Sequence, residues 1–117
     1  MKGVIGLLYC TELNEFIDTS TNDKTFSTDE ITVKIYKNKN GDQCIDYTIM
    51  IIYTITVNLN KNSTKIKGSY NNCYMELPYD CEDRNEFFQL NCYYDFHDFK
   101  FEDLIKIQEW TKYFLTL

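Results

Sequence analysis

The longest regular pattern in the chain is an alternation of apolar and polar residues between Cys44 and Leu59. Side chains of a strand point alternately to its two faces, so this period of two predicts a strand with one face in the core. At ~3.3 Å per residue a single strand here would reach roughly 50 Å, and we expect it to bend or bulge. The positions expected to face the core are Ile45, Tyr47, Ile49, Ile51, Tyr53, Ile55, Val57 and Leu59.

Two further strands are predicted before this segment. The period of two begins at Ile31 and continues to Tyr36, which is typical of a half-buried strand. Asn40-Gly41 favours the positive φ angles of a type I′ turn, so we expect the chain to reverse there. The apolar run over residues 3–10 lacks polar alternation and predicts a buried central strand. Residues 11–29 are polar and are expected to form a short helical turn followed by a loop.

The second half of the chain begins with a reversal at residues 60–63. A more polar strand is expected over residues 64–70, extended by residues 74–77 and ended by Pro78, which cannot donate to a sheet ladder. Alternation over residues 87–94 predicts the last strand.

Beyond Asp98, a good helix N-cap, the apolar period changes from two to 3.6 and predicts an amphipathic helix with Trp110 at the margin of its apolar face. The fold class is therefore expected to be α+β. The expected architecture is an antiparallel sheet of about five or six strands with one C-terminal amphipathic helix packed on one face, and residues 1–117 form a single domain. The expected apolar face of the helix is Phe101, Leu104, Ile107, Thr111, Phe114 and Leu115.

Composition places the chain among folded proteins that do not cross a membrane. Of its 117 residues, 44% are hydrophobic and 16% aromatic, and no stretch approaches the ~20 apolar residues of a membrane-spanning helix. The five cysteines include no CxxC pair, so we expect free thiols in a reducing cytoplasm. A secreted disulfide-bonded binding module stays open as an alternative, because residues 1–10 resemble a short signal peptide and Asn62-Ser63-Thr64 fits a glycosylation acceptor.

Residues suited to catalysis are few. His97 is the only histidine, and Asp95 and Asp98 could hold it as a general base, but a strand-to-helix junction also needs polar caps. Cys92 could serve as a nucleophile, although its predicted position faces inward. We expect no enzyme and no cofactor; a small enzyme using His97 with nearby carboxylates is the alternative. A zinc site is not expected either, because the gaps between its four conceivable ligands match no usual spacing: Cys73, Cys81, Cys92 and His97.

The informative feature is where the charge lies. Residues 1–79 carry nine acids and eight lysines, whereas residues 80–103 carry eight acids against Arg84 and Lys100. The second segment therefore holds −6, which equals the net charge of the whole protein. These acids alternate with aromatic residues that a small core is not expected to accommodate in full: Tyr79, Phe87, Tyr93, Phe96 and Phe99.

Carboxylates attract a basic partner and aromatic side chains anchor it, so this segment predicts a protein interface. The same charge opposes direct binding to nucleic acid or to an anionic membrane. The candidate partner-binding residues are Tyr79, Asp80, Glu82, Asp83, Glu86, Tyr93, Asp95 and Asp98.

The function expected from these features is neutralisation of a basic protein partner such as a toxin or nuclease domain. In general character the chain is similar to bacterial immunity proteins that block toxic nuclease domains, being small, acidic and without catalytic equipment. The similarity is one of type and assigns no residue roles. A phage or mobile-element inhibitor of a host nucleic-acid-targeting defence system would have the same features. The oligomeric state is not indicated.

Overall fold

A computed structural model of the chain describes residues 7–19, 24–50, 53–68, 74–91 and 99–117. In these residues, seven strands form one antiparallel sheet in which each strand pairs with its neighbours in sequence. The strands are β1 (Ile17–Asp18), β2 (Lys24–Ser27), β3 (Ile31–Lys37), β4 (Gln43–Ile49), β5 (Tyr53–Asn58), β6 (Ser63–Gly68) and β7 (Tyr74–Leu77).

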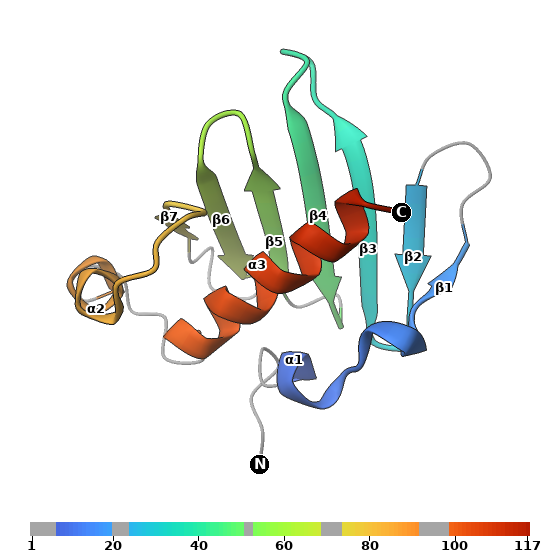
Figure 1. Cartoon of the computed structure of the whole chain (residues 1–117), viewed down its shortest axis with the longest axis horizontal. Helices are drawn as coiled ribbons and strands as arrows, with labels where there is room; N and C mark the ends of the chain where they lie inside the picture. The colour runs from blue at the N-terminus through green and yellow to red at the C-terminus, as the bar shows by residue number, and fades with distance from the viewer. Residues whose placement is uncertain (1–6, 20–23, 51–52, 69–73, 92–98) are drawn as a thin grey trace.

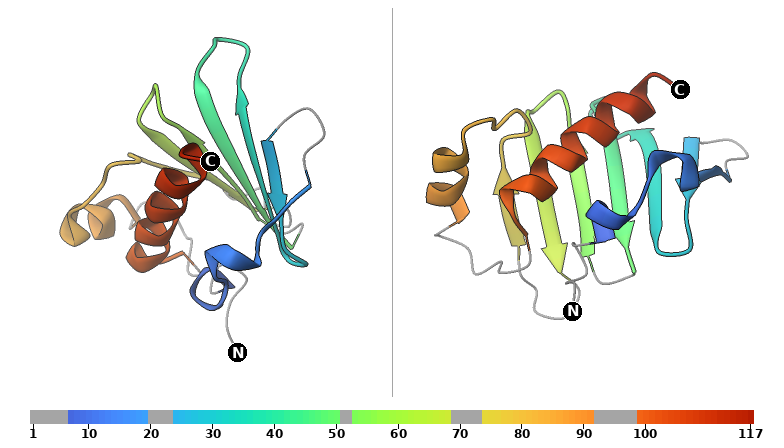
Figure 2. Two further views of the ribbon diagram at one scale, coloured as in Figure 1. Left: turned by 45° about the vertical axis from the view of Figure 1, so that its right-hand side comes forward. Right: turned by 60° about the horizontal axis from the view of Figure 1, so that its bottom comes forward.

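The helices lie on one side of the sheet (Figures 1 and 2). The longest, α3 (Phe101–Leu115), runs obliquely across the strands. The short helices α1 (Leu7–Cys10) and η1 (Leu13–Glu15) lie near the lower ends of the strands in Figure 1. Helix α2 (Arg84–Asn91) lies at the β7 end of the sheet. The predicted α+β class, with an antiparallel sheet and a C-terminal helix, is confirmed.

The strand register explains which side chains form the core. Ile31 pairs with Ile49, and Ile49 pairs with Tyr53, so odd-numbered residues of β3, β4 and β5 share the face that α3 covers. The pairing of Ile55 with Ile66 carries that face onto even-numbered residues of β6. Fully buried side chains on this face include Ile31, Val33, Ile45, Tyr47, Ile49, Ile55, Val57 and Ile66.

The predicted single strand over residues 44–59 is wrong, because the chain reverses within it. Strands β4 and β5 form a hairpin in which Ile49 faces Tyr53, and Met50, with a φ of 50°, begins the reversal. Asn40-Gly41 does reverse the chain, but the turn differs from type I′. The Gly41 N–H donates to the Asn38 carbonyl and the Asn38 N–H to the Asp42 carbonyl, with the positive φ at Gly41, which is a type I turn followed by a bulge.

Several other predicted elements are also corrected. Residues 7–10 form α1 rather than part of a buried strand, and residues 24–27 form β2 rather than a loop. Residues 74–77 are the separate strand β7, which pairs back on β6. Residues 84–91 form α2 in place of the predicted last strand, while residues 92–94 lie outside the described part of the chain.

Aromatic side chains join α3 to the sheet. Trp110 is 1% exposed and lies near the centre of the core rather than at its margin, with its ring 5.3 Å from Phe16 and 6.1 Å from Tyr47. The Phe114 ring lies 5.2 Å from both Phe16 and Phe26. Leu115, expected on the same face, is exposed. Within the described residues, no helix is long and apolar enough to cross a membrane.

A buried hydrogen bond accompanies this packing and supports a stability prediction. The hydroxyls of Tyr47 and Thr111 lie 2.8 Å apart, and both side chains are fully buried. We expect Tyr47→Phe and Thr111→Val each to lower the free energy of unfolding by about 1–2 kcal/mol. Each variant removes the hydrogen bond and leaves the other buried hydroxyl without its partner. The double variant should lose less than the sum of the two by about 1 kcal/mol. Urea denaturation measures all four proteins, and strictly additive losses would contradict the coupling.

Candidate functional site

Four exposed acids lie on the loop of residues 78–83 and on the first turn of α2: Asp80, Glu82, Asp83 and Glu86. Three of them, Asp80, Asp83 and Glu86, act on a buried thiol, that of Cys81, which is 2% exposed. Burial raises the pKa of Cys81, and the negative charges of Glu86, Asp83 and Asp80 raise it further. Asp80, Asp83 and Glu86 therefore lie near the same sulfur atom, and Glu82 stands between Cys81 and Asp83 in the sequence. We call these four residues the acidic patch.

The loop is held to the sheet by Asn62, in the turn between β5 and β6. Asn62 Nδ2 donates to Asp80 Oδ1 at 2.7 Å, and the Asp80 N–H donates back to Asn62 Oδ1 at 3.0 Å. The Tyr79 N–H also donates to the Asn62 carbonyl. The Asp80 carboxylate is therefore exposed but already hydrogen-bonded within the protein.

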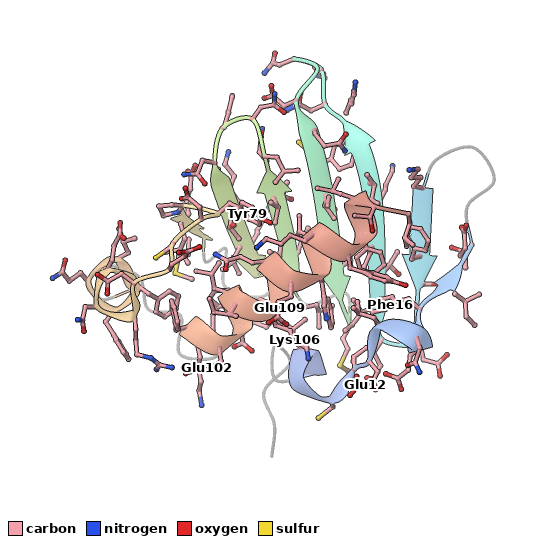
Figure 3. The ribbon with its side chains drawn as sticks, viewed as in Figure 1. Glu12, Phe16, Tyr79, Glu102, Lys106 and Glu109 are labelled. Carbon is pink, nitrogen blue, oxygen red and sulfur yellow. The ribbon has the colours of Figure 1, made fainter. Side chains whose placement is uncertain are left out.

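The loop is held to α3 by Gln108. Its Nε2 donates to the Tyr79 carbonyl and, at 3.2 Å, to the Cys81 carbonyl, while the Tyr79 hydroxyl donates to the Gln108 carbonyl at 3.4 Å. Figure 3 shows Tyr79 between the strands and α3. Tyr79 is half-buried and packs against the core, so it anchors the loop of residues 78–83 to the core.

Helix α2 begins at the acidic patch because Asp83 caps it. Asp83 Oδ1 accepts a hydrogen bond from the Asn85 N–H at 2.8 Å, which satisfies one of the donors left free at a helix N-terminus. Glu86, three residues later, places a second negative charge at the positive end of the helix dipole. Both acids therefore also stabilise α2.

Arg84, the basic residue of α2, is already paired. Arg84 forms an ion pair with Glu102 and lies over the Phe101 ring, 5.1 Å from its centroid. Helical spacing turns Arg84 and Glu86 to different sides of α2. Arg84 therefore fastens α2 to α3 and does not neutralise the patch.

The predicted alternation of acids with exposed aromatic residues is wrong where the structure describes it. Phe87 and Phe99 are each 1% exposed, and the Phe87 ring packs 6.2 Å from Phe99 and 5.6 Å from Phe101. These rings anchor α2 in the core. The exposed aromatic residue of α2 is Phe88, but helical spacing places it beside Arg84, away from Glu86.

The acids of residues 80–103 do not all lie on the surface. Asp103 is only 1% exposed: Oδ2 accepts the Lys100 N–H at 3.0 Å, and Oδ1 has no hydrogen-bond partner. The predicted interface residues Tyr93, Asp95 and Asp98 lie outside the described residues, as do the catalytic and zinc candidates Cys73, Cys92 and His97.

Lys34 and Lys65 lie on the open face of the sheet. Across the sheet face that α3 does not cover, one row of paired positions reads Lys34, Asp46, Thr56, Lys65 and Glu76, so opposite charges alternate between neighbouring strands. Such cross-strand pairs compensate one another locally. The charges in this row therefore offset one another within the sheet.

The two buried cysteines of the described residues are not activated as nucleophiles. Cys44 and Cys81 are buried free thiols whose pKa burial raises, which keeps them protonated and inert at neutral pH. In the portion of the chain that the structure describes, no group of three potential ligands is placed to hold a metal ion. Asn62 and Gln108 were not anticipated from the sequence, which gives no signal that either side chain contacts residues 79–81.

Asp103 supports a prediction about stability and pH. Burial raises its pKa from 3.8 to about 6, so the folded protein binds this proton more tightly than the unfolded chain does. The stabilisation is complete below pH ~4 and is lost as the pH rises through about 6. Asp103→Asn keeps an acceptor for the Lys100 N–H and removes the buried charge, so we expect it to stabilise the protein at pH 7.5 by about 1–3 kcal/mol.

Urea denaturation of both proteins between pH 4.5 and 7.5 measures this effect. The difference in unfolding free energy should shrink towards pH 4.5, where Asp103 is protonated. A difference that stays constant across this range would contradict a titrating buried carboxyl.

No protein-family model matches the sequence, and neither a curated protein nor a solved structure is significantly similar to the chain. The geometry and charge of the acidic patch are the observations that bear on its function.

Proposed function

We propose that this protein binds and neutralises a basic protein partner through the acidic patch. The observation that carries the proposal is the arrangement of Glu82, Asp83 and Glu86, which are exposed to solvent on a loop and helix start that are fixed to the rest of the fold. A basic surface that docks here meets several carboxylates in set positions.

The electrostatics favour a macromolecular cation. Three of the patch carboxylates act together on Cys81, and Arg84 is occupied by Glu102, so the local potential is negative. Such a potential steers a basic protein and raises its association rate. It opposes phosphate, and we do not propose direct binding to nucleic acid.

The partner class we propose is a nuclease or toxin domain, whose nucleic-acid-binding cleft is basic. A fixed array of carboxylates imitates the spaced negative charges of a phosphate backbone and could occupy that cleft. Bacterial immunity proteins against nuclease toxins act as small acidic inhibitors of this type, and an inhibitor carried by a phage or mobile element would use the same physics.

Charge reversal at Glu82 and Glu86 tests the proposal. The double variant Glu82→Lys/Glu86→Lys leaves Asp83 in place as the cap of α2, because losing that cap would cost stability as well as charge. With a basic partner captured from the native host, we expect at least about a tenfold loss of affinity at low salt and a weaker salt dependence. Titration calorimetry at several salt concentrations measures both, and the captured partner should cleave nucleic acid and be inhibited by the wild-type protein.

A matched control is Asp29→Lys/Glu30→Lys. These two exposed acids lie in the turn between β2 and β3, far along the sheet from α2, and their reversal changes the net charge by the same amount. The control should keep most of the affinity. Equal losses in both variants would mean that net charge, rather than the acidic patch, attracts the partner.

A further inference from the structure

Gln108 makes contacts that fix the conformation of the loop of residues 78–83, which we call the acidic loop. Its side-chain amide donates to two loop carbonyls, those of Tyr79 and Cys81. The backbone carbonyl of Gln108 accepts a hydrogen bond from the Tyr79 hydroxyl. One α3 residue thus spans the middle of the loop of residues 78–83. Gln108 itself is fixed, because its neighbours Ile107 and Trp110 are buried against the sheet.

On the α3 side, the described contacts that order the loop are the two hydrogen bonds from the Gln108 side chain, the bond from the Tyr79 hydroxyl to the Gln108 backbone carbonyl, and the packing of Tyr79 and Cys81 against the core. Fixing the backbone of one residue costs on the order of 1–2 kcal/mol in conformational entropy, and a loop that is already ordered does not incur that cost on binding. Order also keeps Asp80, Asp83 and Glu86 close together although they repel one another.

We infer that Gln108 is the positioning residue of the acidic patch: it holds the loop so that several carboxylates meet one multivalent cation together. This inference rests on the proposed function. Gln108 contributes no charge, and its side-chain amide is engaged by the Tyr79 and Cys81 carbonyls, so its effect on binding is separable from that of the acids.

Asn62 holds the same loop from the sheet side but is a poorer test. Its φ of 51° lies in the left-handed region, which asparagine tolerates better than most residues, so a substitution would also strain the turn between β5 and β6. Gln108 lies within α3, where methionine has the same helix propensity and a similar length.

The test compares Gln108→Met with Gln43→Met. Gln43 makes the same kind of contact in the β3–β4 hairpin, where its Nε2 donates to the carbonyls of Tyr36 at 3.1 Å and Cys44 at 3.4 Å. Both variants keep the net charge and lose two side-chain-to-carbonyl hydrogen bonds. If Gln108→Met does not fold, Gln108→Asn replaces it, since its shorter amide cannot span both carbonyls.

Two measurements are made on the full chain. Amide hydrogen exchange should accelerate at least about tenfold at residues 79–83 in Gln108→Met and remain unchanged in the core strands. Tetralysine peptide, titrated at low salt and followed by NMR, should bind Gln108→Met about three- to tenfold more weakly than the wild type. Gln43→Met should change neither the loop exchange nor the tetralysine affinity.

The possible results separate this inference from the proposed function. If exchange in the loop is unchanged, or if it accelerates while tetralysine affinity stays the same, Gln108 does not position the patch and the inference is wrong. If the wild type binds tetralysine no better than Glu82→Lys/Glu86→Lys, the acidic patch does not bind cations and the proposed function fails, whatever the exchange shows.

Discussion

The packing of α3 against the sheet is the interaction on which the rest of the structure depends. Trp110 and Phe114 place the helix over β4 through contacts with Tyr47, and Phe16 brings the N-terminal segment onto the same rings. The same helix carries Gln108 towards the acidic loop and Glu102 towards α2. The positions of the acidic loop and of α2 therefore depend on the core packing, because α3 contacts the sheet, the loop and α2.

The hairpin of β4 and β5 shows why apolar periodicity identified the face but missed the fold of residues 44–59. Ile49 and Tyr53 are paired, and three residues separate them, so the core-facing positions keep the same odd-numbered phase on both sides of the turn. An alternation of apolar and polar residues with a period of two therefore gives no sign of such a reversal. The sequence between Ile49 and Tyr53, Met50-Ile51-Ile52, also lacks the Gly, Asn or Pro that marks most turns.

Helix α2, by contrast, had a signal in the sequence. Asp83 followed by Glu86 three residues later is a helix-start pattern, and the structure uses Asp83 as the cap. The competing alternation through Phe87 and Phe88 is too short to distinguish a strand from a helix. Charge singled out the segment of residues 80–103, but sequence could not separate the exposed Glu82 from the paired Glu102 or the buried Asp103, since those differences arise from tertiary contacts.

The way in which the acidic loop is held bears on why its charges are concentrated. Carboxylates that served solubility alone would be more stable spread over the surface, because like charges held close together repel and lower stability. Here Asn62 and Gln108 hold the loop so that Asp80, Asp83 and Glu86 remain near one buried thiol. Asp83 and Glu86 recover part of that energy at the start of α2, but Glu82 has no such role in the described contacts of the chain. The proposed binding of a basic partner would give these hydrogen bonds a role that solubility alone does not require, because a bound cation offsets the repulsion between the carboxylates.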